Sequence, residues 1–393
     1  MAGPLAGIRV LEMANFISGP YAAMLLADLG ATVWKVEMTQ GGDPFRKWGG
    51  RKGGSRPQFA AYNRGKQSIA VDITTPGGKE VFRRMAAEVD VLIENFRPGA
   101  LERQGVGYET LRASNSGLVY CAISGLGQSG PFAKRPSYDS IGMALSGLWS
   151  RFVDLANPRP PGPAVADHVT ALYATYAVLG ALVHRLRGGE GQRIDVSMLL
   201  ANMAFMPETI ANYLAEGEVG DLDSRPSRSQ AYGLLAADDL PVAIHISSVP
   251  KFWEGLTRAI GRPDLAEDPR FATNADRVKH YAELRELLEG IFRTRPRSAW
   301  LERLLAEDVP SAPIYTIDEA LASPEAAPVQ PVAEYGRGER AVRLIRPPAD
   351  FSGTAVERGG PPPDLGEQTV EILVALGYGA AEVEALRTEG AVA

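Results

Sequence analysis

Short apolar runs alternate with amphipathic segments along the first 200 residues of the chain. The apolar runs have the length and β-branched content of buried strands, and the segments between them have helical spacing. Gly30 follows one predicted helix, and Thr75-Pro76 has the form of an N-cap and a first helical residue. The predicted strands are Ile8–Met13, Ala31–Glu37, Ile69–Ile73, Val91–Asn95 and Leu118–Ser124, and the predicted helices between them include Tyr21–Leu29 and Gly77–Val89. This order predicts an α/β fold with a parallel sheet covered by helices on both faces.

The pattern changes in the second half of the chain. One long, mostly apolar helix is predicted from Pro163 to Arg187, and the polar stretch Glu216–Ser229 is typical of a linker. Ala231–Ser247 resembles a hairpin around Asp238-Asp239, and three helical patterns follow it. We therefore predict a large domain in residues 1–215, a linker in 216–229, a smaller α+β domain in 230–325, and a return linker with the C-terminal part of the large domain in 326–393.

Composition narrows the possible functions. The 393 residues are 45% hydrophobic and carry a net charge of −6, which is typical of a globular protein and disfavours a nucleic-acid partner. Cys121 is the only cysteine and the four histidines are isolated in sequence, so we expect no disulfide and no metal site. The longest apolar stretch, Val169–Val183, is shorter than a membrane span, and the N-terminus lacks the pattern of a secretory signal. We expect a cytoplasmic protein without membrane association.

Cationic and amide side chains recur in four short segments of the first 140 residues. Three of these segments lie near the ends of predicted strands, and ligands of open α/β sheets bind at the carboxyl ends of the strands. Guanidinium and ammonium groups gathered there would suit a phosphorylated ligand, although each segment alone could be a solvated loop. The candidate binding residues are Arg46, Asn63, Arg64, Lys66, Asn95, Arg97, Arg103 and, less strongly, Lys134. The chain has neither G-x-G-x-x-G after its first strand nor a P-loop motif, which disfavours a dinucleotide or nucleotidase site.

Asp167 lies at the start of the long apolar helix. It could be an N-cap, which stabilises a helix by about 1 kcal/mol through hydrogen bonds from backbone N–H groups. It could also be a nucleophile, because an aspartate carboxylate can form covalent intermediates with activated acyl donors. The residues alone leave both interpretations open.

These residues belong to a wider set of motifs with a recognisable order. The matching segments are Leu5–Leu11, Gly19-Pro20, Leu29–Ala31, Lys35–Glu37, Gly42-Asp43 with Arg46, Asn63–Lys66, Glu94–Gly99, Gly130–Phe132, Arg135–Asp139, Ala166-Asp167, Gly191-Gln192, Asp268–Phe271 and Asn274–Arg277. Together they resemble the class III CoA-transferases, the superfamily of formyl-CoA transferase, carnitine CoA-transferase and α-methylacyl-CoA racemase. The likeness covers roughly residues 5 to 325.

The resemblance implies a large Rossmann-like domain, a small domain, and two subunits interlocked as a homodimer. It implies coenzyme A as acyl carrier, bound in part by Phe96, and a small carboxylic acid as second substrate. Asp167 would form an acyl anhydride and then an aspartyl-CoA thioester, beside Tyr138, Ile17 and Ser18 as substrate-binding residues. The formyl transferases carry a glutamine where this chain has Ile17, which argues against formyl-CoA and oxalate as substrates.

Two alternatives remain within the same superfamily. The racemases use a histidine in a Gly-His-Asp motif, and this chain has Tyr138 in that place. An ordinary tyrosine, with a pKa of about 10, is a poor base near neutrality, so acyl-CoA racemisation is disfavoured. A non-catalytic acyl-CoA-binding protein is also possible, although the retained Asp167 argues against it.

Overall fold

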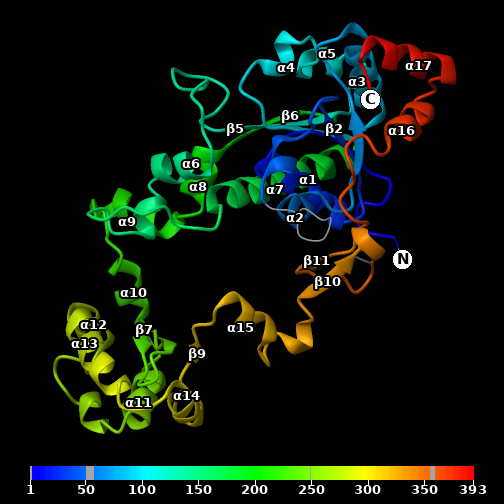
Figure 1. Ribbon diagram of the computed structural model, residues 1–393. Coiled ribbons are helices and arrows are strands. Elements are labelled where there is room, and N and C mark those ends of the chain that lie inside the picture. Colours follow the sequence, from blue (N-terminus) through cyan, green and yellow to red (C-terminus); the bar gives the residue numbers. More distant parts are fainter. Residues whose placement is uncertain (1, 50–56, 248, 355–358) are drawn as a thin grey trace. The chain divides into compact units, whose positions relative to one another are not determined.

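The computed structural model describes residues 2–49, 57–247, 249–354 and 359–393. The chain folds into two compact units (Figure 1). The first unit contains the chain up to Trp149 together with Arg159–Ile210 and Pro331–Ala393. The second contains Ser150–Pro158 and Ala211–Gln330.

A six-stranded parallel sheet forms the centre of the first unit. The strands follow the order β3-β2-β1-β4-β5-β6, so the chain order reverses between β1 and β4. Val10 of β1 lies opposite Val33 on one side and Val91 on the other. The strands are β1 (Arg9–Met13), β2 (Thr32–Glu37), β3 (Gln67–Ala70), β4 (Val91–Glu94), β5 (Val119–Ser124) and β6 (Arg193–Ser197). This is the strand order of doubly wound Rossmann sheets, and it confirms the predicted α/β fold with a parallel sheet.

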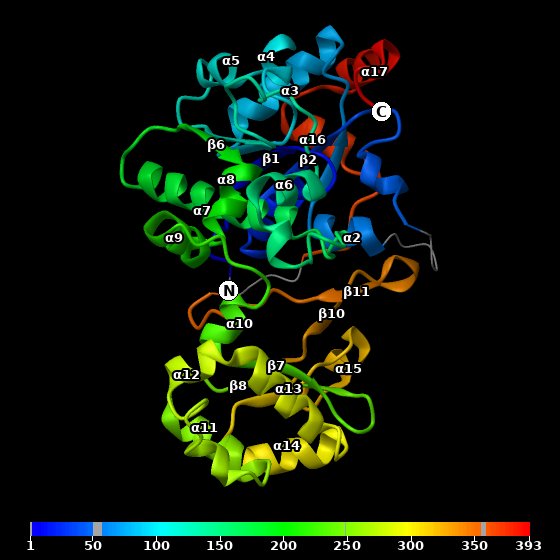
Figure 2. The same cartoon turned by 90° about the vertical axis from the view of Figure 1, so that its left-hand side faces the viewer.

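Neighbouring residues of one strand enter different cores, because side chains alternate across a sheet. Leu11 belongs to a core with α3, α5, α16 and α17. Val10 belongs to a core with α1 and α7 on the opposite face. Figure 2 shows the helices on both sides of the sheet. The helices of the two faces are α1 (Ser18–Asp28), α3 (Pro76–Glu88), α4 (Ala100–Arg103), α5 (Tyr108–Arg112), α7 (Val165–Leu186), α16 (Thr369–Ala375) and α17 (Ala380–Glu389).

Helix boundaries follow local chemistry. The Thr75 side chain accepts a hydrogen bond from Gly78 N, and Pro76 occupies the first turn of α3, as the sequence predicts. The long apolar helix begins at Val165, two residues after the predicted start. The remaining helices of this unit, α2 (Pro57–Asn63), α6 (Asp139–Ser146) and α8 (Met198–Ala204), connect the strands, while α9 (Pro207–Glu216) continues into the second unit.

The C-terminal segment returns to the first unit. After the hairpin of β10 (Val332–Tyr335) and β11 (Val342–Ile345), Gln368 N donates to Ser68 O at 2.9 Å. Val71 and Val392 form an antiparallel bridge close to the end of the chain. These contacts extend β3 and place α16 and α17 on the core formed with α3.

The second unit has an antiparallel sheet of β7 (Ala231–Leu235), β8 (Pro241–His245) and β9 (Ser311–Pro313). Asp239 turns the β7–β8 hairpin with a φ of 59°, in agreement with the predicted hairpin. The helices around the sheet are α10 (Ser224–Ser229), α11 (Pro250–Ala259), α12 (Asn274–Lys279), α13 (Tyr281–Phe292), α14 (Arg297–Ala306) and α15 (Ile317–Ala322). Residues 216–229, which the sequence predicts as a linker, belong to this unit and contain α10.

By length and composition, helix α7 could cross a bilayer. One of its faces is instead packed in the core beneath the sheet, through Ala171, Ala174 and Val178. A core helix of a soluble protein has the same composition, so we interpret α7 as part of the core. The cytoplasmic location stays a prediction.

Candidate functional site

A cavity of about 230 Å³ lies at the carboxyl edge of the six-stranded sheet. The loops after β1 and β4 form much of its wall, so it lies where the strand order reverses. Open α/β sheets bind their ligands at this position. The lining residues are Asn15, Phe16, Ser18, Asn95, Phe96, Arg97, Pro98, Ile123, Ser124, Gly125, Ala133, Arg135, Pro136, Ser137, Tyr138, Asp167 and Met198.

The Asn95 side chain links the loops that follow β1 and β4 through hydrogen bonds. Its Oδ1 accepts from Asn15 N at 2.9 Å, and its Nδ2 donates to Asn15 O at 2.8 Å. The same Nδ2 donates to Ser18 Oγ at 3.2 Å. The side chain that the sequence assigns to ligand binding therefore also fixes the shape of the cavity wall.

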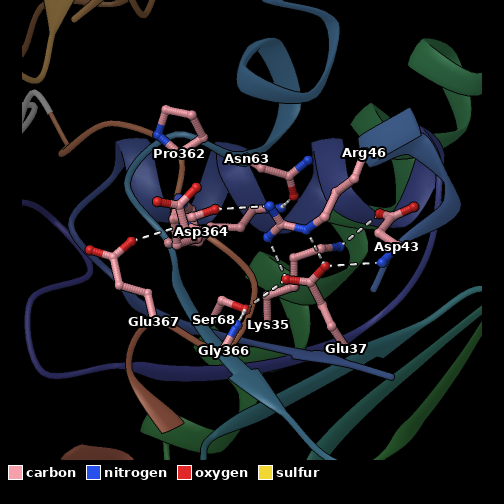
Figure 3. Close-up of polar contacts among 12 residues, drawn as sticks. Lys35, Glu37, Asp43, Arg46, Asn63, Ser68, Pro362, Asp364, Gly366 and Glu367 are labelled. Carbon is pink, nitrogen blue, oxygen red and sulfur yellow. Dashed lines mark hydrogen bonds and ion pairs between the residues drawn. The ribbon is translucent and has the colours of Figure 1, made fainter. Parts of the chain in front are cut away.

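A buried network of ion pairs holds the loop after β1 in place (Figure 3). Lys35 Nζ donates to Glu12 Oε1 at 2.7 Å and to Ala14 O at 2.9 Å, and it lies 3.0 Å from Asp43 Oδ2. Asp43 Oδ1 accepts from Phe16 N at 3.1 Å, which holds Phe16 at a φ of 64°. Burial alone would lower the pKa of Lys35, but the carboxylates around it outweigh burial and raise that pKa. The lysine therefore stays charged inside the protein.

Arg46 and Glu37 form a second part of this network. The guanidinium makes two hydrogen bonds of 2.6 Å to the Glu37 carboxylate, and its Nη1 donates to Pro363 O at 3.0 Å. Ser68 Oγ donates at 2.7 Å to Glu37 Oε1, the oxygen that also accepts from Arg46 Nη2 (Figure 3). Burial would raise the pKa of Glu37, but the hydrogen bond from Arg46 and the charge of Lys35 lower it to about 2.

The predicted phosphate-binding residues separate into two groups in the structure. Arg46, Asn63, Arg64 and Lys66 make internal contacts. Lys66 is fully buried against Glu12, at 2.5 Å, and it donates to Asn63 Oδ1 at 2.9 Å. Arg64 pairs with Asp28 at 2.6 Å. The three cations of this group pair with carboxylates of the protein, and Asn63 bonds to Lys66 and to Phe59 O, so these side chains have internal partners.

Asn95, Phe96 and Arg97 form the other group, because they line the cavity. Arg103 ends α4 and is exposed, and its Nη1 lies over Gly99 of the same loop. Lys134 is exposed between the lining residues Ala133 and Arg135. The available cations of the predicted set are therefore Arg97, Arg103 and Lys134.

Asp167 is the third residue of α7 and lines the cavity. Its interpretation as an N-cap is wrong, because Ala164 is the N-cap residue and makes no side-chain capping bond. Within the described residues, no hydrogen bond or ion pair reaches the Asp167 carboxylate. Burial and, to a smaller degree, the charge of Asp139 raise its pKa to about 7.

The neighbouring His168 belongs to a separate aromatic group. Its Nε2 lies 2.9 Å from Tyr62 Oη, and its ring packs against Tyr21. Burial lowers the pKa of His168, so the imidazole is neutral near pH 7. Nothing places His168 in the cavity wall, in line with the expectation that it points away from Asp167.

Of the other predicted substrate residues, Ser18 and Tyr138 line the cavity, whereas Ile17 is not among its lining residues. Ser18 begins α1 and is buried, while Ile17 is the N-cap residue of that helix. Tyr138 is exposed, and its ring contacts Phe16 edge to face at 5.6 Å. Among the described residues, no group of three or more metal-ligating side chains is arranged to hold an ion.

Sequence reasoning did not single out Asp139, Arg135 or Ser137. Asp139 is the acceptor that caps α7, through bonds from Ala166 N at 2.8 Å and Asp167 N at 3.2 Å. One signal could have indicated this, because Ala164 has no side chain able to cap a helix and the cap must then come from elsewhere. Arg135 and Ser137 could not have been separated from ordinary loop residues by sequence alone.

Comparison with known proteins gives one consistent family. Residues 5–369 match the protein family described as CoA-transferase family III. The succinate–glutarate CoA-transferase of Agrobacterium fabrum is 35% identical over 95% of this chain and 96% of its own length. The acetyl-CoA:oxalate CoA-transferase of Acetobacter aceti is 32% identical over 91% of this chain and 95% of its own.

A solved structure supports the same family assignment. The crystal structure of a CAIB/BAIF family protein from Brucella suis is 34% identical, covers 96% of this chain and all of its own, and superposes with a TM-score of 0.84.

The raised pKa of Asp167 predicts how its replacement changes stability with pH. An acid whose pKa is higher in the folded state than in the unfolded state loses stability as pH rises from the unfolded value, near 4, to the folded value, near 7. Asp167→Asn removes that loss, so at pH 8 the variant should unfold with a free energy higher by on the order of 1–3 kcal/mol. The gain should disappear below pH 4.

Urea unfolding followed by circular dichroism at pH 4, 6 and 8 measures this difference. Asp72→Asn is the control, because it makes the same chemical change at the protein surface, where Asp72 Oδ1 accepts from Thr74 N. An Asp167→Asn variant that is less stable than the wild type at pH 8 would contradict the unpaired, half-buried carboxylate.

Proposed function

The chain belongs to CoA-transferase family III and is an acyl-CoA:carboxylate CoA-transferase, and from this premise we propose that Asp167 is its nucleophile. The observation that carries the proposal is the half-buried Asp167 carboxylate in the wall of the cavity, with its pKa raised to about 7 and no described partner. A carboxylate that is partly desolvated and unpaired is more reactive than one held by cations.

The proposed reaction proceeds through three covalent states of Asp167: a mixed anhydride with the donor acid, an aspartyl-CoA thioester, and a mixed anhydride with the acceptor acid. One carboxylate oxygen attacks the thioester carbon, the C–S bond breaks, and CoA leaves as the thiolate from a mixed anhydride. The thiolate then attacks the aspartyl carbonyl, which releases the donor acid as a carboxylate and leaves an aspartyl-CoA thioester. The acceptor carboxylate attacks the aspartyl carbonyl of that thioester, the C–S bond breaks, and CoA leaves as the thiolate from a second mixed anhydride. The thiolate then attacks the acceptor carbonyl of this anhydride, which forms the acceptor acyl-CoA and releases the Asp167 carboxylate.

Negative charge develops on a carbonyl oxygen at each of these steps. Helix α1 begins at Ser18, beside Asp167 in the cavity wall, and its first turn contains no acidic residue. The N-terminus of a helix carries a positive potential and free N–H groups, which favour a developing oxyanion. We therefore assign Ile17 and Ser18 to the side of the cavity that receives the reacting carbonyl.

Replacement of Asp167 tests the nucleophile directly. Asp167→Asn should abolish turnover, because an amide cannot form the anhydride, while folding and CoA binding persist. Wild-type protein incubated with acetyl-CoA or succinyl-CoA should gain a covalent adduct on the peptide containing Asp167, and hydroxylamine should trap it. Mass spectrometry of intact and digested protein measures both effects.

Two outcomes would count against this assignment. A fully active Asp167→Asn variant would exclude Asp167 as nucleophile. A wild-type protein that binds CoA but never forms the adduct would favour the non-catalytic acyl-CoA-binding alternative. Asp72→Asn serves again as the control and should react like the wild type.

We propose that coenzyme A is held by the loop Asn95–Gly99 and by the exposed cations near it. Arg97 lines the cavity, Arg103 lies over Gly99, and Lys134 is exposed beside the cavity wall. Phe96 supplies an apolar surface in the same loop. Arg46, Asn63, Arg64 and Lys66 contribute to this site by supporting the loops, because their polar groups already have internal partners.

Removing one of the exposed cations should weaken CoA binding. Loss of a charge-assisted phosphate contact costs about 1.5–3 kcal/mol, so Arg97→Ala and Arg103→Ala should each raise the Kd for CoA roughly tenfold or more. Arg84→Ala, which removes an exposed arginine paired with Glu80 on α3, should leave the Kd unchanged. Arg64→Ala should lower the melting temperature instead. Calorimetric titration with CoA would contradict the site if both Arg97→Ala and Arg103→Ala bind normally.

We further propose that two copies of the chain, each with a large Rossmann-like and a small domain, interlock as a homodimer. An apolar stripe on α7 supports this, because Leu172, Tyr176, Val183 and Leu186 are all at least half exposed. With the partly buried Leu179, their spacing alternates between four and three residues, which is the spacing of helices that pack against another helix. Exposed apolar stripes of this kind mark interaction surfaces.

The dimer should persist at nanomolar concentration in analytical sedimentation. Tyr176→Glu combined with Leu186→Glu should weaken it, because charged groups would enter the stripe. Leu305→Glu, a change at an exposed leucine on α14, is the control and should not alter the sedimentation coefficient. A folded and active wild-type monomer would refute the proposal.

A further inference from the structure

The first turn of α7 depends on a residue from another helix. Ala164 provides no capping side chain, and Oδ1 of Asp139 accepts both from Ala166 N at 2.8 Å and from Asp167 N at 3.2 Å. Asp139 is the first residue of α6, and it follows Ser137 and Tyr138 of the cavity wall. One carboxylate thus connects the backbone of Asp167 to the segment that forms the opposite wall.

The packing of α6, α7 and α8 keeps this connection fixed. Met143, Ala166 and Met198 share a small buried core, and a side chain at Gly142 would collide with Met198. Thr170 Oγ1 donates to Ala166 O at 2.6 Å on the following turn. The Asp139 carboxylate therefore cannot shift without displacing the start of α7.

The charges facing Asp167 are few. Asp139 on α6 is the acidic group beside it, and the cavity wall carries the guanidinium groups of Arg97 and Arg135. Tyr62 of α2 is close enough for the Asp167 charge to contribute to its raised pKa, of about 12. The remaining titratable groups around this helix start are His168 of α7, Tyr21 of α1 and Tyr138, which precedes α6. Of these groups, Asp139 is the one whose negative charge acts on Asp167 near neutral pH.

We propose that Asp139 is a positioning residue for the transfer reaction, because it holds the backbone of Asp167 at the start of α7 and keeps a negative charge beside the Asp167 carboxylate. This inference rests on the proposed role of Asp167 as nucleophile. The two functions of Asp139 reside in one side chain but differ in what they require. Holding the backbone requires an oxygen acceptor, whereas the second function requires a charge.

The charge has a defined effect on the nucleophile. Two neighbouring carboxylates resist simultaneous ionisation, so Asp139 makes Asp167 more basic than burial alone would. A more basic carboxylate is a stronger nucleophile once it is ionised, and a pKa close to the working pH keeps a large ionised fraction. Burial raises the pKa of Asp139, and the two backbone N–H groups of Ala166 and Asp167 oppose part of that rise because they favour its ionised form.

The substitution Asp139→Asn separates the two functions. Asparagine caps a helix about as well as aspartate, so the backbone bonds remain while the charge disappears. We expect the pKa of Asp167 to fall by on the order of one unit. The acid limb of the pH profile for adduct formation should move to lower pH by the same amount. Asp139→Ala should show that shift together with a lower melting temperature and slower adduct formation at every pH.

Two readouts keep this test independent of the overall mechanism. Carbon-13 NMR of protein labelled at aspartate carboxyls, assigned with Asp167→Asn, reports the pKa of Asp167 without any substrate. Rapid-quench mass spectrometry with acetyl-CoA between pH 5 and 9 reports the rate of adduct formation. Asp72→Asn is the control for both, because it removes a carboxylate that accepts from a backbone N–H but does not line the cavity.

The outcomes distinguish this inference from the proposed function. An NMR shift in Asp139→Asn without any adduct in the wild type would retain the role of Asp139 and reject Asp167 as nucleophile. An adduct in the wild type with an unchanged pKa and pH profile in Asp139→Asn would overturn the inference and leave Asp139 as a helix cap. If Asp139→Asn failed to fold, the pKa of Asp167 in Asp139→Glu would decide, because glutamate retains the charge but displaces the acceptor.

Discussion

The shape of the cavity depends on the ion pairs of the buried Lys35 ammonium group. It joins β2 to Glu12 of β1, to the backbone oxygen of Ala14 and to Asp43. Asp43 in turn holds Phe16 N, so a charge at the centre of the sheet determines the path of the loop above it. An uncompensated buried charge costs about 3–5 kcal/mol, so the members of this network cannot be exchanged one at a time without strong destabilisation. As a result, the loop after β1, at the carboxyl edge of the sheet, is held in one position like a segment of the core.

Asp167 represents the opposite use of burial. The network beneath the loop pairs each buried charge with an opposite one, and the cavity leaves one carboxylate without a described partner. The first arrangement favours stability and the second costs stability in exchange for reactivity. Both contribute to the same cavity, because the loop held by Lys35 and Asn95 leads into α1 and lines the cavity together with Asp167.

Much of the sheet could be predicted from the sequence, since alternating apolar runs and helix signals depend on local residues. Strand order could not, because it depends on which strands meet through the helices. The predicted strand Ile69–Ile73 is observed as Gln67–Ala70, since pairing with β2 begins at Gln67 and the chain then turns to meet the C-terminal segment. The sequence also cannot separate a cation that awaits a ligand from one with an internal partner. Arg97 and Lys66 both lie close to an asparagine and a glycine in the sequence, but Lys66 pairs with Glu12 of a strand more than 50 residues away.

The assignment of Asp167 shows how a candidate residue can carry an incorrect local explanation. Its place at the start of a helix suggested an N-cap, and the resemblance to a known family suggested a nucleophile. The structure separates the two roles by giving the capping to Asp139, whose oxygen accepts from Ala166 N and Asp167 N. An aspartate that capped its own helix would have its oxygens occupied by backbone N–H groups, which lowers its pKa and its reactivity. Transfer of the cap to a second aspartate therefore leaves the oxygens of the first free to react, and it does so without losing the helix start that places them in the cavity.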